Sequence, residues 1–139
     1  MIPPGPDDPA DSSTPFPGNN IKNPLSIFFN YGRYDVVNVT NEGLGQGQSA
    51  KLTKFVEDAT RVKASEITVN GFASPEDNLP NAQLPLNRAT ALKNLLDQRF
   101  ATGPVKPTVT VKTTSVLSGD QSTWPSLRRA DIYIVSPTI

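Results

Sequence analysis

Along this chain the spacing of apolar residues alternates between a period of two and a period of three to four, which limits its fold more than any other feature. From residue 25 to 31 every second residue is apolar, as in a strand with one buried face. From residue 52 to 62 apolar residues recur at spacings of three and four, as on one side of a helix. The two patterns repeat at residues 66–71 and 89–100, and two more strands are predicted at 109–117 and 131–134. The predicted order is β-α-β-α-β-β.

This order predicts an α/β (α+β) fold, a two-layer sandwich in which two helices cover one face of a four-stranded mixed sheet. Strands that are joined through a helix cross over right-handedly, and polar residues at the outer strand positions, such as Asn30, Thr68 and Asn70, leave the other face uncovered. Pro85 places the start of the second helix at residues 84–86, because proline is tolerated in the first turn of a helix. The segment around Trp124 is expected to be a long loop.

Residues 1–24 differ in composition from the rest of the chain. They hold seven of the fourteen prolines and three aspartates, and no basic residue precedes Lys22. Such a segment cannot bury enough apolar surface to fold, so we expect a flexible, extended linker at 1–24 and one domain at 25–139. Any signal peptide or lipid-bearing cysteine would lie upstream of this segment.

Several classes of function are excluded by composition. The 139 residues contain no His and no Cys, which removes His- or Cys-ligated zinc, thiol chemistry and the Ser-His-Asp type of catalysis. Thirteen basic residues balance thirteen acidic ones, so the chain lacks the excess of positive charge that nucleic-acid binding needs. No apolar run is long enough for a membrane span. Carboxylate-pair or Ser-Lys catalysis stays open in principle, but no motif positions it, and we expect neither an enzyme nor a cofactor.

The most informative segment runs from the second predicted strand into the second helix. A turn rich in Ser, Asn and Gly supplies backbone N–H donors, the helix start supplies partial positive charge, and Arg88 adds a guanidinium. A guanidinium matches a carboxylate through two parallel hydrogen bonds. These residues predict a small anion site, with Arg88 projecting into an open hollow that a carboxylate ligand can enter.

This segment resembles the OmpA-like peptidoglycan-binding domain, which carries G-[FYH]-[TA]-D-x-x-G after a strand and N-x-x-L-S-x-x-R-A at the start of a helix. Two more segments are similar to that family: Phe28 to Tyr31 to its F-N-F element, and Leu127 to Ile132 to its N-R-R-V-x-I element. Together the matches cover about residues 25 to 135. The residues that match the two central patterns are Gly71, Phe72, Ala73, Asn81, Leu84, Arg88 and Ala89.

The resemblance implies noncovalent binding of the peptidoglycan stem peptide, notably diaminopimelate, whose carboxylate the family's helix arginine holds. Ser74 stands where the family has the aspartate that takes the ligand's amino group, so the chain looks like a divergent A-S-P-E variant in which Glu76 or Asp77 supplies the carboxylate. Pro85 and Leu127 also replace a Ser and an Asn of the pattern. The candidate ligand-binding residues are Ala73, Ser74, Glu76, Asp77, Asn81, Leu84, Arg88, Arg128 and Arg129.

Each of these residues also has a structural alternative. Arg88 can pair with an internal acid, Asn81 can cap a turn, and Arg128 and Arg129 can be ordinary charges at a strand end. The resemblance implies a periplasmic protein, attached to the outer membrane through sequence upstream, with peptidoglycan as its partner. The alternative function is an OmpA-like scaffold that has lost the ligand and mediates protein–protein assembly in the envelope.

Overall fold

A computed structural model of the chain describes residues 20, 24–41, 43–76 and 83–136. The expected linker at 1–24 therefore lies almost entirely outside the described residues, as do the candidate residues Asp77 and Asn81. The elements in chain order are β1 (Leu25–Phe28), α1 (Gln48–Arg61), β2 (Glu66–Ala73), α2 (Leu84–Ala101), β3 (Thr108–Val116), η1 (Gln121–Thr123), α3 (Trp124–Leu127) and β4 (Arg129–Ser136).

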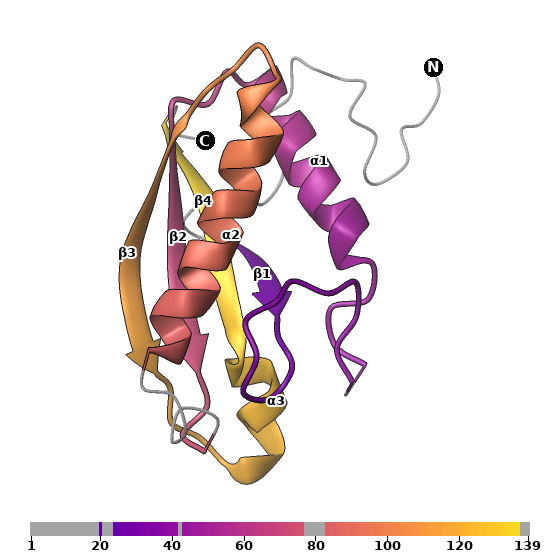
Figure 1. Ribbon diagram of the computed structural model, residues 1–139, viewed down its shortest axis with the longest axis vertical. Helices are drawn as coiled ribbons and strands as arrows, with labels where there is room; N and C mark the ends of the chain where they lie inside the picture. The colour runs from indigo at the N-terminus through magenta and orange to yellow at the C-terminus, as the bar shows by residue number, and fades with distance from the viewer. Residues whose placement is uncertain (1–19, 21–23, 42, 77–82, 137–139) are drawn as a thin grey trace.

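The four strands form one mixed sheet in the order β1-β4-β2-β3, with α1 and α2 together on one face (Figure 1). β2 and β3 are parallel and joined through α2, whereas β4 runs antiparallel to both β1 and β2. The predicted fold class is confirmed. No helix among the described residues is long and apolar enough to cross a membrane.

The core lies between the sheet and the two helices. Ile67 and Val69 face it from the central strand, and Phe55 and Leu92 face it from α1 and α2. All four side chains are fully buried. The predicted apolar stripes are therefore the core faces of the helices. Burying one large apolar side chain contributes about 1.5–3 kcal/mol to stability, so this layer is the main source of the stability of the domain.

Three segments differ from the sequence-based expectation, among them β2, which runs to Ala73 where residue 71 was the predicted end. β1 ends at Phe28 and the chain turns away after Phe29, so Tyr31 is exposed and does not continue the buried face. Residues 121–127 form a short 3-10 turn and one turn of helix where a loop was expected. That turn is held locally, since the Trp124 indole N–H donates to the Gly119 carbonyl at 3.0 Å.

Gly71 lets α2 start directly against β2. A Cβ at this position would lie 2.0 Å from the carbonyl oxygen of Pro85, in the first turn of α2. Only glycine permits such a close approach of two backbones without displacing one of them. The strand end at Phe72 to Ser74 and the start of α2 are therefore brought together at one end of the sheet.

Candidate functional site at the end of the sheet

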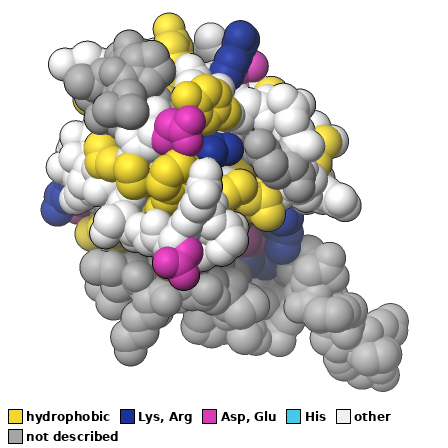
Figure 2. All heavy atoms as spheres, turned by 90° about the horizontal axis from the view of Figure 1, so that it is seen from below, with side chains coloured by type: hydrophobic (Ala, Val, Ile, Leu, Met, Phe, Trp, Pro, Cys, Tyr) yellow, Lys and Arg dark blue, Asp and Glu magenta, His cyan; other side chains and the backbone are white. Residues whose placement is uncertain are grey.

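The candidate residues that the structure describes gather where β2 ends and α2 begins. Ala73 is the last residue of β2 and Ser74 follows it, and both are fully buried. Leu84 begins α2 and is also fully buried, so its side chain belongs to the core. Glu76 is exposed in the turn after β2. Viewed from this end, the surface shows basic side chains bordered by hydrophobic and acidic ones (Figure 2).

Arg88 does not project into an open hollow, so this expectation is wrong. Its side chain is 0% exposed. The guanidinium donates to three backbone carbonyls: Nε to Arg33 at 2.8 Å, Nη1 to Phe72 at 3.0 Å and Nη2 to Asn30 at 3.0 Å. It also lies 5.4 Å from the centre of the Phe29 ring. A buried cation is tolerated only with such hydrogen bonds, and here they join α2, the end of β2 and the loop after β1.

Arg128 lies at the same end, directly before β4. Its Nε atom donates to Ser74 Oγ at 3.2 Å, and its guanidinium lies 5.1 Å from the centre of the Tyr31 ring. Arg128 is 7% exposed, while Tyr31 beside it is 46% exposed. A guanidinium over an aromatic face is held by cation–π attraction as well as by its hydrogen bond. The structure therefore brings together Arg128, Ser74 and Tyr31.

Arg129 lies on the other side of the sheet. Its guanidinium is 5.1 Å from the centre of the Phe72 ring and its Nε atom is 3.1 Å from Asp131 Oδ1. Because Gly71 and Ala73 are buried toward the helices, the alternation along β2 directs Phe72 to the outer face. The structure thus separates Arg129 from Arg88 and Arg128, although all three contact the strand end at Phe72 to Ser74.

The loop after β1 carries one more charged pair. Arg33 Nε lies 2.8 Å from Asp35 Oδ1, and both side chains are at least half exposed. The hydrogen bond from Arg33 holds the pKa of the Asp35 carboxyl below its usual value, so this carboxylate is ionised at neutral pH and balances the charge of Arg33.

Gln48 fixes this loop, and nothing in the sequence pattern identifies it. Its side chain is fully buried at the start of α1. The amide accepts from the Phe28 N–H at 2.5 Å and donates to the carbonyls of Phe28 at 3.0 Å and Val37 at 2.8 Å. Gly45 makes room for it, because a Cβ there would meet the Gln48 side chain. The loop after β1 is thus held at Val37 by Gln48 of α1, and at Asn30 and Arg33 by Arg88 of α2.

No protein-family model matches the chain, and no curated protein matches it in sequence. Solved structures do match in shape. The OmpA-like domain of FopA1 from Francisella tularensis superposes with a TM-score of 0.57 at 21% identity, covering 81% of this chain and 73% of that one. The cell wall anchor of the T6SS from Pseudomonas aeruginosa superposes with a TM-score of 0.53 at 16% identity, covering 81% and 80%. At such low identity the likeness establishes an OmpA-like fold.

Proposed function

We propose that this domain binds peptidoglycan noncovalently through the stem peptide, notably its diaminopimelate residue, and tethers an envelope protein to the cell wall. The OmpA-like fold supports the proposal, and one protein that shares it is described as a cell wall anchor. We further propose a periplasmic location with attachment to the outer membrane. Binding, with no chemical turnover, is the activity that we assign to the domain.

The observation that carries the proposal is the position of the Arg128 guanidinium between Ser74 and the exposed Tyr31 ring. A guanidinium suits a carboxylate better than any other side chain does, and diaminopimelate presents carboxylates together with an amino group. We assign the ligand's carboxylate to Arg128. We assign its amino group to the exposed Glu76, two residues after Ser74, as the A-S-P-E variant implies.

Arg88 has a positioning role in this proposal. Its hydrogen bonds to the carbonyls of Asn30 and Arg33 fix the loop that presents Tyr31 to the Arg128 guanidinium. The helix arginine of the family pattern then acts on the ligand through the loop. Asp77 and Asn81 remain proposed contacts of the ligand.

The second candidate function is an assembly scaffold that does not bind peptidoglycan. The burial of Arg88 among backbone carbonyls favours it, because that guanidinium is already engaged by the protein itself. Ser74 favours it as well, since a neutral hydroxyl replaces a charged partner of the ligand and charged hydrogen bonds contribute about 1.5–3 kcal/mol. The scaffold would leave sacculi unbound and co-purify with an envelope protein.

Cosedimentation of the chain with purified sacculi separates the two functions. The parent protein is expected to bind, and Arg128→Gln is expected to weaken binding about tenfold or more. Arg129→Gln is the matched control, because it removes the same charge one residue away on the outer face of the sheet. Thermal unfolding confirms that each variant is folded. Tyr31→Ala tests the same site and leaves the hydrogen bonds of the buried Arg88 guanidinium in place.

Absence of binding by the parent protein would overturn the stem-peptide proposal in favour of the scaffold. Equal losses in Arg128→Gln and Arg129→Gln would overturn the assignment of the site, because they would show a general charge effect.

A further inference from the structure

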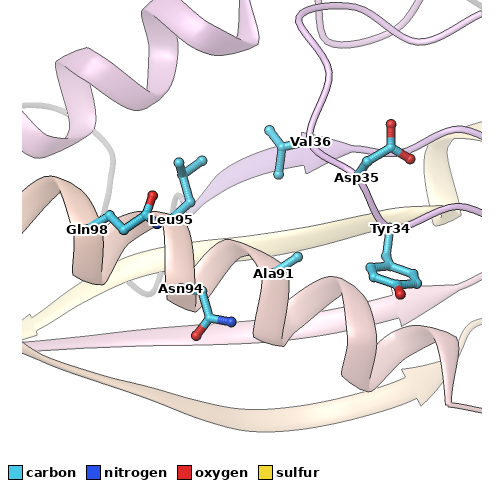
Figure 3. A pocket seen from close by; sticks show the side chains of 7 residues that line it. All are labelled: Tyr34, Asp35, Val36, Ala91, Asn94, Leu95 and Gln98. Atoms are coloured by element: carbon cyan, nitrogen blue, oxygen red, sulfur yellow. The ribbon is translucent and has the colours of Figure 1, made fainter.

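A groove of about 350 Å³ lies between the loop after β1 and the outer side of α2, away from the end of the sheet (Figure 3). The loop contributes Tyr34, Asp35 and Val36, and the helix contributes Ala91, Asn94, Leu95 and Gln98. This volume falls within the range of about 300–1,000 Å³ that is usual for small-molecule sites. None of these residues belongs to the stem-peptide site proposed above.

The groove combines an apolar floor with an aromatic ring and neutral polar groups. Val36, Ala91 and Leu95 are half-buried and form the floor, and Val36 and Leu95 point toward one another across it (Figure 3). Tyr34 lies at one end and is 49% exposed. Asn94 and Gln98, one helical turn apart, add two exposed amides that each donate and accept hydrogen bonds.

The charged groups at this groove are already paired with one another, which favours an uncharged ligand. Among the described residues that line the groove, Asp35 alone carries a formal charge, and it is paired with Arg33 at 2.8 Å. Its carboxylate points away from α2 (Figure 3). A phosphate or an acidic peptide would therefore find no positive charge among these lining residues, and a basic peptide would find only a carboxylate that Arg33 already pairs.

A protein partner fits the groove less well than a small ligand does. Among the described residues, the exposed large hydrophobic side chains are Tyr31, Tyr34, Val39, Leu86 and Val116, and only Tyr34 lines the groove. Protein interfaces depend on several large anchoring side chains buried at their centre. A single aromatic ring beside a small apolar floor is suited instead to one or two sugar rings.

We propose that this groove binds an N-acetylated amino-sugar chain, the glycan part of peptidoglycan. The C–H face of a sugar ring would pack on Tyr34, an acetamido methyl group would occupy the floor at Ala91, and hydroxyl and amide groups would bond to Asn94 and Gln98. The inference rests on the proposed function, which supplies a ligand with both peptide and glycan parts. Tyr31 and Tyr34 lie three residues apart on the loop that Arg88 fixes, so one peptidoglycan fragment can contact both sites.

The test is an NMR titration of the chain with tetra-N-acetylchitotetraose, an uncharged glycan without a peptide, and with cellotetraose, which lacks the acetamido groups. We expect shifts confined to residues 34–36 and 91–98, and binding of cellotetraose at least about fivefold weaker. Tyr34→Ala is expected to weaken chitotetraose binding about fivefold or more. Val39→Ala, at a residue of the same loop that is 40% exposed and does not line the groove, is expected to leave this affinity unchanged.

Absence of shifts, equal binding of the two oligosaccharides, or an unchanged affinity in Tyr34→Ala would overturn the proposal. A change of oligomeric state in Tyr34→Ala, seen by size-exclusion chromatography, would instead assign the groove to self-association and also overturn it. Failure of the stem-peptide proposal has a different signature, in which Arg128→Gln binds sacculi as the parent protein does while chitotetraose still shifts residues 34–36.

Discussion

The Nε atom of Arg88 lies 2.8 Å from the carbonyl oxygen of Arg33, a residue 55 positions earlier in the chain. Through this bond and two others, one buried cation on α2 fixes the loop after β1 and the end of β2. Arg88, which the family pattern assigns to the ligand, thus holds three parts of the domain together.

Arg88→Ala is expected to lower the free energy of unfolding by at least about 3 kcal/mol, because three backbone carbonyls lose the donor that joins α2 to the loop and to β2. Urea unfolding measures the change. Arg99→Ala is the control on the same helix, where the side chain donates to a single hydroxyl, Thr53 Oγ1, and a loss under about 1 kcal/mol is expected. Normal stability together with lost sacculus binding would show that Arg88 contacts the ligand itself.

Gly71→Ala is expected to destabilise the domain by about 2 kcal/mol or more, because the new Cβ would clash with the Pro85 backbone and push α2 away from β2. Thermal unfolding measures this effect. Gly103→Ala provides the matched control, since the nearest atom there is 3.8 Å away, and it should be neutral or slightly stabilising. Similar melting temperatures for the two variants would contradict the close approach of strand and helix.

Gln48→Ala is expected to lower the free energy of unfolding by about 2 kcal/mol or more, because the backbone groups of Phe28 and Val37 lose their partner. Hydrogen exchange at the Phe28 amide should accelerate in parallel. Gln98→Ala, at an exposed position on α2, should change stability by less than about 0.5 kcal/mol. Unchanged protection of the Phe28 amide would argue against the bond to Gln48.

Glu76→Gln is expected to weaken sacculus binding about threefold to tenfold without changing stability, because an exposed carboxylate loses its charge. Asp120→Asn, an exposed acid in the loop before η1, should have no effect on binding. The loss in Glu76→Gln should shrink at high salt, where exposed charges are screened. A loss of the same size at every salt concentration would speak against a charge contact at Glu76.

Much of the fold could be predicted because periodicity records which face of each element is buried. The start of α2 follows directly from Pro85, which lies in the first turn of the helix. The end of β2 could not be placed, because Phe72 and Ala73 continue the strand only by pairing with Ser115 and Val116 of β3. A four-residue helix such as α3 is too short to show a period.

The site was harder to predict because its geometry depends on residues distant in sequence. The sequence around an arginine at the start of a helix is the same whether its guanidinium is exposed to solvent or bonded to three backbone carbonyls. The carbonyls of Asn30 and Arg33 that enclose Arg88 come from a loop whose path no pattern specifies. The clustering of Arg128 with Ser74 likewise depends on the pairing of β2 with β4.

Residues 30–37 are hydrogen-bonded to Arg88 at Asn30 and Arg33 and to Gln48 at Val37, contacts that hold this part of the loop before any ligand arrives. Tyr31 and Tyr34 are therefore presented in fixed places, and binding would not have to offset the entropy of ordering them. A domain whose binding residues are already held in place gains affinity from modest contacts. Its backbone should be nearly the same with and without bound peptidoglycan.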